Sequence, residues 1–320
     1  MAYVAGDKIK ATEYNTFVNS SSDPYGYNHF AGTGSGEYGL GQTHIATVSG
    51  GDGSSITASQ WNTLLTSMDT IANHTNDTLT ARTQVTTGDT IAIKAAVEAD
   101  LATLAASVAA GCPNATALAT NAVGTSTNAG TWNTSSTIER SVTFADATTM
   151  RHFFNAGGKI RVDPSCITGI AGSKDDVFNA LTVTAIGNLD SGQTASTRSC
   201  SGETLTTNGL GLGFRDLTTS YQTIIKLTSD NAGYTSNTVE IQAKLDAAVD
   251  SCVTITIKMV STDAADDTTY TSPNTSGVPA NPNEAPRMTM ALIEVHPTAG
   301  EGLASAIQSS SNAQVSNSAS

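Results

Sequence analysis

The chain has 320 residues, enough for two ordinary domains or for one large β domain with a helical extension. Charged residues make up only 13% of it, and the net charge of −13 has the wrong sign for a surface that binds nucleic-acid phosphates. No apolar run approaches the length of a membrane-spanning helix. Nucleic-acid binding and membrane insertion are therefore not expected, and the abundance of Thr, Ser, Ala, Asn and Gly favours β structure and turns.

Two stretches near the start, residues 9–18 and 56–65, repeat the same order of residue types, and a Gly-Asp pair precedes each of them. Thr12 and Ser59 stand just before apolar residues at helical spacing, so they are the expected N-caps of two helices. A third helix is expected over residues 97–108, where apolar residues again follow steps of three and four.

The apolar stripes of these helices need a surface to pack on, because a short amphipathic helix gains little stability alone. Two interpretations stay open: the stripes pack within the chain, or they dock on another subunit by helix-in-groove packing. If they dock, the interface is expected to use large apolar and aromatic side chains of the first 70 residues. They are Tyr14, Phe17, Tyr25, Tyr27, Trp61, Leu64, Leu65 and Met68.

A Gly- and Tyr-rich segment lies between the two repeats, at residues 24–42. Its spaced glycines superficially match phosphate-binding loops, but no apolar strand precedes them and no Lys-Ser or Lys-Thr pair follows. Glycines interleaved with aromatics instead predict an extended arm, whose tyrosines supply contact area against another chain.

The pattern then divides the chain into four parts. Residues 1–110 form an N-terminal helical attachment region with the arm, 111–134 read as a linker, 135–297 as a β-sandwich domain, and 298–320 as a flexible C-terminal tail. The apolar period becomes two after the linker. Strands are expected at 138–144, 159–162, 181–186, 221–227, 239–245, 253–259 and 288–292. The predicted fold is mainly β: an antiparallel, jelly-roll-like sandwich preceded by short amphipathic helices.

One turn inside the sandwich is predicted in detail. Phe153 and Phe154 bring adjacent rings to a strand end, and Asn155, Gly157 and Gly158 supply residues that tolerate positive φ. The expected structure is a β-hairpin pinned by aromatics, with no need for a substrate.

Residues that could carry chemistry are scattered. The five histidines stand singly, without any HxH or HExxH spacing. Four cysteines lack a CxxC pair and are expected to be buried free thiols, with a Cys166–Cys200 bridge as the alternative. The acidic group of Asp263, Asp266 and Asp267 is expected to be a solvated loop rather than a cation site. Catalysis, a cofactor and a bound metal are therefore not expected.

Five segments of the chain resemble virion structural proteins of tailed bacteriophages, particularly those of marine and cyanobacterial myoviruses. They are residues 32–42, 56–64, 151–162, 216–224 and 234–244, in the same order as in that group, and the resemblance covers most of the chain. It implies a non-enzymatic particle component, made in the cytoplasm of a bacterial host and located in the virion.

The resemblance leaves the position in the particle open. A tail, fibre, baseplate or neck protein is the first expectation, a receptor-binding tail component the second, and a capsid decoration protein the third. A glycan-cleaving enzyme is a distant alternative, because paired carboxylates are recognised only in three dimensions. The expected partners are other virion proteins and copies of the chain itself, with a trimer inferred by analogy, and a host surface receptor if the second alternative holds.

Overall fold

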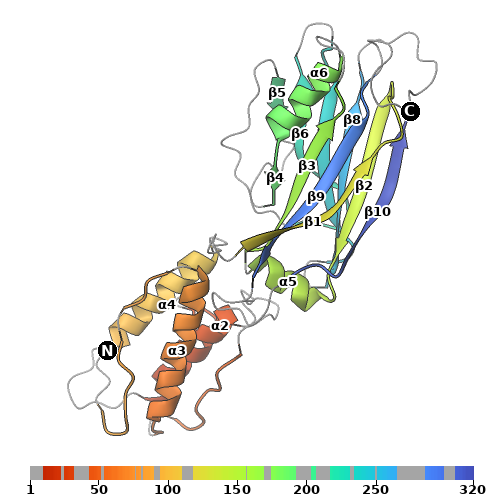
Figure 1. Ribbon diagram of the computed structural model, residues 1–320. Coiled ribbons are helices and arrows are strands. Elements are labelled where there is room, and N and C mark those ends of the chain that lie inside the picture. The colour runs from red at the N-terminus through yellow and green to blue at the C-terminus, as the bar shows by residue number, and fades with distance from the viewer. Residues whose placement is uncertain are drawn as a thin grey trace. The chain divides into compact units, whose positions relative to one another are not determined.

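The computed structural model describes the chain as two compact units (Figure 1). Unit 1 contains residues 1–119, 148–158 and 296–308, and unit 2 contains 120–147, 159–295 and 309–320. Described residues are 10–22, 25–31, 43–51, 54–75, 77–80, 82–89, 94–109, 118–155, 157–168, 174–191, 203–206, 217–230, 234–248, 251–264, 285–298 and 307–320.

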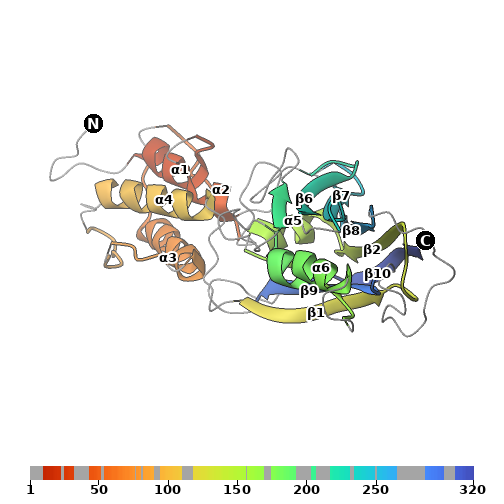
Figure 2. The same cartoon turned by 90° about the horizontal axis from the view of Figure 1, so that it is seen from above.

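Unit 1 is helical. Its helices are α1 (Ala11–Asn19), α2 (Tyr27–Ala31), α3 (Ala58–Thr75), α4 (Lys94–Ala109) and most of α5 (Ala147–Asn155). Helix α4 contacts α1 and α3, while α2 contacts α1, α3 and α4 (Figure 2). The three helices predicted from the sequence are confirmed. The arm at residues 24–42 is described only over 25–31, where it contains helix α2, and the rest of it lies outside the described residues.

Both helix starts lie slightly earlier than predicted. Helix α3 begins after Thr57, whose hydroxyl accepts a hydrogen bond from the Gln60 backbone N–H at 3.2 Å. The Gln60 side chain in turn accepts one from the Thr57 N–H at 2.9 Å, which completes a capping box. Ser59 is therefore inside the helix. Thr12 is also inside its helix, because α1 starts after Lys10 without a side-chain cap.

Unit 2 consists of two antiparallel sheets with short helical segments between strands. The first sheet has the order β1 (Leu118–Thr127), β9 (Met288–Pro297), β3 (Lys159–Cys166), β4 (Leu189–Asp190). The second has the order β10 (Ser311–Ala319), β2 (Ser135–Thr143), β8 (Thr254–Thr262), β7 (Thr238–Leu245), β6 (Gln222–Ser229), β5 (Glu203–Thr206). Figure 2 shows β1 and β9 on the opposite side of unit 2 from β6, β7 and β8.

Six of the predicted strands are confirmed. In β2 and β7 every second residue is buried, and β3 alternates in the same way up to Pro164, so one face of each sheet supplies apolar side chains to the core. Core residues from these faces include Ile138, Val142, Ile160, Val162, Ile225, Val239, Ile241, Met259, Met290 and Leu292. The predicted mainly β fold with N-terminal helices is confirmed, and the two antiparallel sheets are consistent with a β-sandwich.

The strand predicted at 181–186 is wrong. Helix α6 (Lys174–Asn179) continues there into a π-helix, η2 (Ala180–Ile186). The buried residues Phe178, Leu181 and Ala185 follow helical steps, whereas Val183 is 49% exposed. An apolar run this short fits either period, and here packing selects the helical one.

The hairpin predicted at Phe153, Phe154, Asn155, Gly157 and Gly158 is also wrong. Residues up to Asn155 belong to helix α5, and the glycines connect this helix to β3. The Gly157 N–H donates to the Phe154 carbonyl at 3.0 Å, and the Gly158 N–H donates to the Phe153 carbonyl at 2.7 Å. Gly157 has a φ of +90°, which terminates the helix in the usual left-handed way. The positive φ was anticipated, but it ends a helix instead of turning a hairpin.

The predicted linker and tail both contain strands. β1 occupies 118–127 of the predicted linker 111–134 and belongs to unit 2 from Thr120 onward, and β10 occupies 311–319 of the predicted tail 298–320 and pairs with β2. The Ser320 carbonyl accepts hydrogen bonds from the N–H groups of Asn133, Thr134 and Ser135. Neither strand contains a charged residue or a regular apolar alternation. The sequence of these two strands therefore lacks the apolar alternation by which the other strands were predicted.

Candidate functional site

The side chains predicted as a docking anchor lie inside unit 1. Tyr14, Trp61, Leu64 and Met68 are 0% exposed, and Phe17, Leu65 and Tyr27 are at most 3% exposed. The rings of Phe17 and Trp61 meet edge to face with centroids 6.1 Å apart. Of the two interpretations left open by the sequence, packing within the chain is the one that this burial supports. These side chains are not an exposed apolar stripe.

Polar atoms of the same aromatics are used within the unit. The Tyr14 hydroxyl donates to the Gln60 carbonyl at 3.3 Å, and the Tyr27 hydroxyl donates to the Thr43 carbonyl at 3.3 Å. Burial raises the pKa of both phenols. Tyr25 stacks on His29 with centroids 4.1 Å apart. The tyrosines of the arm that the structure describes thus bind inside unit 1.

Three asparagines clamp extended segments onto the helices, a feature that the sequence analysis missed. The Asn15 amide donates to the Val48 carbonyl at 2.9 Å and accepts from the Val48 N–H at 2.8 Å. Asn62 makes the same two bonds to Val85, both at 2.9 Å. Asn15 and Asn62 occupy equivalent positions in the two sequence repeats. That coincidence was the signal available in the sequence.

The third clamp has the same geometry outside the repeat. The Asn28 amide donates to the Ile45 carbonyl at 2.9 Å and accepts from the Ile45 N–H at 2.8 Å. Each clamp satisfies both polar groups of one backbone residue, as a neighbouring strand would. Unit 1 therefore holds its connecting segments by side-chain amides.

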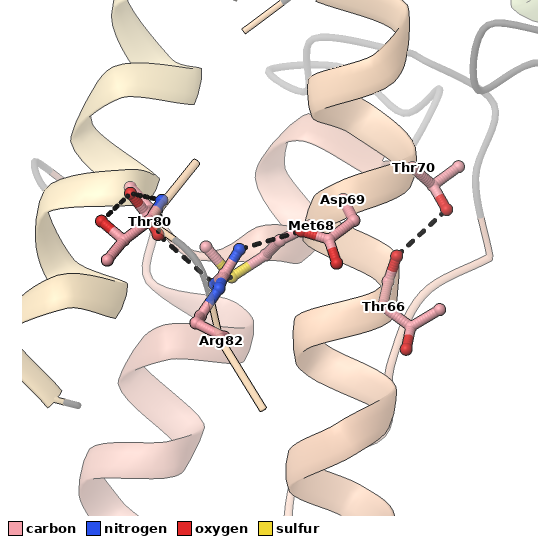
Figure 3. A network of polar contacts seen from close by, with 7 residues as sticks. Thr66, Met68, Asp69, Thr70, Thr80 and Arg82 are labelled. Carbon is pink, nitrogen blue, oxygen red and sulfur yellow. Dashed lines mark hydrogen bonds and ion pairs between the residues drawn. The ribbon is translucent and has the colours of Figure 1, made fainter. Parts of the chain in front are cut away.

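A charged network joins α3, α4 and the segment between them (Figure 3). The guanidinium of Arg82, whose side chain is 4% exposed, lies 3.0 Å from an Asp69 oxygen and 3.5 Å from an Asp100 oxygen. Asp100 also accepts hydrogen bonds from the N–H and hydroxyl of Thr80, both at 3.1 Å. The carboxylate of Asp100 is thus engaged on several sides. This arrangement pins the segment in place and resembles a structural tie more than a catalytic pair.

An open groove of about 650 Å³ lies along the polar face of α3. Its described lining consists of small and neutral polar residues: Ala58, Ser59, Asn62, Thr63, Thr66, Ser67, Gln84, Thr86 and Thr87. No side chain in that lining titrates near neutral pH. The groove offers hydroxyl and amide groups to a neutral polar partner, and it offers no acid or base for catalysis.

Unit 2 contains a fully buried ion pair. The Lys174 ammonium, at the start of α6, lies 2.7 Å from the carboxylate of Asp263, just after β8, and both side chains are 0% exposed. The ring centroid of Tyr234 is 5.9 Å from the same ammonium. The prediction that Asp263 lies in a solvated loop is wrong. Its acidic neighbours Asp266 and Asp267 lie outside the described residues.

The half-buried Tyr221, just before β6, lies beside Lys244 of β7 and Lys258 of β8. The Tyr221 ring centroid is 3.7 Å from the Lys258 ammonium and 4.5 Å from the Lys244 ammonium. Cation–π contacts of this kind hold the lysine heads over the ring. The cluster brings two cations to one ring, and Glu139 lies directly opposite Lys258 on the neighbouring strand β2.

The thiol of Cys166 is not part of a disulfide. The alternative Cys166–Cys200 bridge is therefore not formed, although Cys200 itself lies outside the described residues. Burial raises the pKa of the Cys166 thiol to about 12. Over the part of the chain that the structure describes, no three His, Cys, Asp or Glu side chains are grouped so that they would hold a metal ion.

Comparison with known proteins returned no relatives: no family model, no curated protein and no solved structure matches the chain. Among the described residues, no helix has the length and hydropathy needed to cross a membrane.

Proposed function

We propose that this protein is a non-enzymatic structural component of a tailed-bacteriophage virion, which docks onto the particle through unit 1 and presents the β unit outward. The observation that carries the proposal is the division into two units, each with its own packed core. Such a division lets attachment and presentation be separate tasks. The five segments that resemble phage structural proteins supply the biological setting. The favoured position is the tail, fibre, baseplate or neck, and capsid decoration is the alternative.

Docking would use the polar outer surface of unit 1, because most of its large aromatic side chains are buried in the core of the unit. The groove along α3 is one hollow on this surface, and it suits a polar backbone or side-chain partner. Other virion proteins and copies of the chain are the proposed partners, with a trimer by analogy to symmetric phage assemblies. A jelly-roll-like variant of the sandwich and a Gly- and Tyr-rich arm lying against a neighbouring chain are the finer parts of this proposal.

Receptor binding by the β unit is a second candidate, favoured by the cluster of Tyr221, Lys244 and Lys258. Tyrosines are enriched in binding interfaces, and ammonium groups form charge-assisted hydrogen bonds with acidic groups. A glycan array probed with the full chain and with Tyr221→Ala would separate the two candidates. Because β1 and β10 complete the sheets, the full chain is the right probe and a fragment of 135–297 is not.

The experiment for docking is incorporation into particles. Thr66→Arg places a long cation in the groove, and Thr103→Arg places the same cation on an exposed threonine of α4 outside it. We expect Thr66→Arg to lower the amount of protein in purified particles and Thr103→Arg to leave it unchanged. Equal incorporation of both variants would reject the groove as the docking surface. Absence of the wild-type chain from the particles would reject the virion role itself, and release of products from the host envelope would support the enzyme alternative.

A further inference from the structure

The last strand of the chain forms one edge of the six-stranded sheet. β10 pairs with β2 along its length, and no described strand lies on its other side (Figure 1). An edge of this kind presents a row of backbone donors and acceptors to whatever approaches it.

This edge strand is ordered although it buries almost nothing. Its first five residues are exposed whichever face of the sheet they point to, and Val315 is 53% exposed. Fixing a strand costs conformational entropy, and apolar burial normally offsets that cost. In β10 the offset inside one chain comes from the ladder to β2 and a few side-chain bonds, such as that from the Asn317 amide to the Thr127 carbonyl at 2.7 Å.

The ladder shows which backbone groups face outward. Ser320 and Ser135 exchange both of their N–H to carbonyl bonds, so they are a hydrogen-bonded pair. In an antiparallel ladder such pairs alternate with non-bonded ones. By the register, Ser316 and Ser318 therefore bond to β2, whereas the N–H and carbonyl groups of Asn317 and Ala319 point away from it.

Charge distinguishes this edge from that of β4, and free backbone groups distinguish it from that of β1, which is equally uncharged but whose Thr125 and Thr127 carbonyls accept side-chain bonds. β10 contains no charged residue in a chain whose net charge is −13, and it contains no lysine or proline to block an approaching strand. Its protective feature is a bulge at Val315, and the residue there is an exposed valine. The edge of β4 instead contains Asp190, which pairs with Arg161, and β1 uses its Thr125 carbonyl to accept a bond from Arg140.

We infer that the β10 edges of two copies of this chain pair with each other, antiparallel and across a two-fold axis, so that two six-stranded sheets become one continuous sheet. A second copy is the occupant that the charge pattern favours, since two acidic chains meet there without placing like charges side by side. The inference rests on the proposed assembly function and names a partner for it. The contact is two-fold, so it joins copies in pairs, which the trimer drawn from analogy does not provide.

The test begins with the mass of the full-length protein in solution, measured by light scattering across a range of concentrations. The wild type is expected at twice the 32.7 kDa of one chain. Val315→Lys places an ammonium on the uncharged edge, so pairing is expected to weaken by on the order of tenfold or more. Val183→Lys is the matched control, because Val183 is exposed to a similar extent, 49% against 53%, but lies on η2. It should leave the mass unchanged.

Residue-specific amide exchange supplies a second readout. In paired chains the outward amides of Asn317 and Ala319 should exchange as slowly as the inward amides of Ser316 and Ser318. In Val315→Lys, protection should be lost at Asn317 and Ala319 and kept at Ser316 and Ser318, which shows that β10 itself remains folded.

Three results would overturn the inference: a mass of 32.7 kDa at every concentration, an unchanged dimer in Val315→Lys, or fast exchange at Asn317 and Ala319 within a dimer. Particle incorporation is scored separately. A chain that enters particles without pairing would defeat this inference alone, and a chain that pairs but is absent from particles would defeat the proposed virion role alone.

Discussion

Breaking the buried ion pair of unit 2 should destabilise that unit strongly. Lys174→Met keeps the length and apolar stem of the side chain but removes its charge, and it leaves the Asp263 carboxylate 0% exposed without its cation. At 2.7 Å, two unit charges in a medium of effective dielectric about 20 attract each other by roughly 6 kcal/mol. Desolvation opposes that attraction in the intact pair, but the variant keeps the desolvation of the carboxylate and loses the attraction.

The expected cost of Lys174→Met is therefore about 3–5 kcal/mol in the free energy of unfolding. The double variant Lys174→Met with Asp263→Leu should recover most of that loss, because an apolar pair of similar volume removes the stranded charge. Lys94→Met is the control. Its ammonium lies 3.0 Å from Glu13 in unit 1, but both side chains are more than 20% exposed, so the loss should be about 0–1 kcal/mol.

The two tryptophans allow each unit to be followed by fluorescence. Trp61 is 0% exposed in α3 of unit 1, and Trp132 is 0% exposed in unit 2, where its indole N–H donates to the Pro286 carbonyl at 2.6 Å. In a Trp61→Phe background, urea unfolding monitored at Trp132 reports unit 2, and in a Trp132→Phe background the Trp61 signal reports unit 1, where the Lys94→Met control is measured. The reasoning is refuted if Lys174→Met costs no more than Lys94→Met, or if the double variant is less stable than Lys174→Met.

Three further outcomes are expected. Asn62→Ala removes both bonds to Val85 and should cost about 1–3 kcal/mol, seen as a lower urea midpoint of the Trp61 signal, whereas Asn62→Gln, which cannot make the same short bridge, should rescue little. Thr57→Ala breaks the capping box of α3 and should cost about 0.5–2 kcal/mol in the same assay. Because the pKa of Cys166 is raised to about 12, its alkylation by iodoacetamide at pH 8 should be roughly a thousandfold slower in the folded chain than in urea, as read by peptide mass spectrometry.

The confirmed strands and the strands that sequence reasoning missed differ in how they are stabilised. Residues 239–245 alternate Val239, Ile241, Ala243 and Leu245 with polar residues, and all four alternating side chains are buried. Burial of one face of a strand requires an apolar residue at every second position, so such a strand can be recognised in the sequence. β10 is stabilised by its ladder to β2, and a ladder uses backbone atoms that every residue has. Such a strand is invisible to hydrophobic periodicity, and a Ser- and Asn-rich composition suggests disorder instead.

The predictions of β structure at α5 and η2 were wrong for another reason. In α5 the residues Met150 and Phe153 are buried at a helical step, but the glycines that follow them suggested a hairpin. In η2 the apolar residues from Leu181 to Ile186 fit two periods equally well. A short apolar run does not contain enough residues to discriminate the two, and the surrounding packing makes the choice.

In the candidate sites, too, the sequence identifies which side chains are apolar and regularly spaced, but it does not identify their contact partners. Large apolar residues at helical spacing were recognised as one stripe and expected to dock on another subunit, but they are buried within unit 1, because spacing alone does not say whether a stripe faces its own chain or another. The ion pair of Lys174 and Asp263 joins residues 89 positions apart, so no local pattern announced it.

The sequence repeat of residues 9–18 and 56–65 has a structural role inside unit 1. Tyr14 and Trp61 are equivalent positions, and both are 0% exposed in the core. Asn15 and Asn62 are equivalent as well, and both clamp a backbone residue downstream. The repeated residues therefore encode a way of folding, in which a helix and a returning segment hold each other. The proposed contacts with other subunits would then use the polar side chains that unit 1 leaves on its surface, such as those of the groove along α3, and the backbone edge of β10.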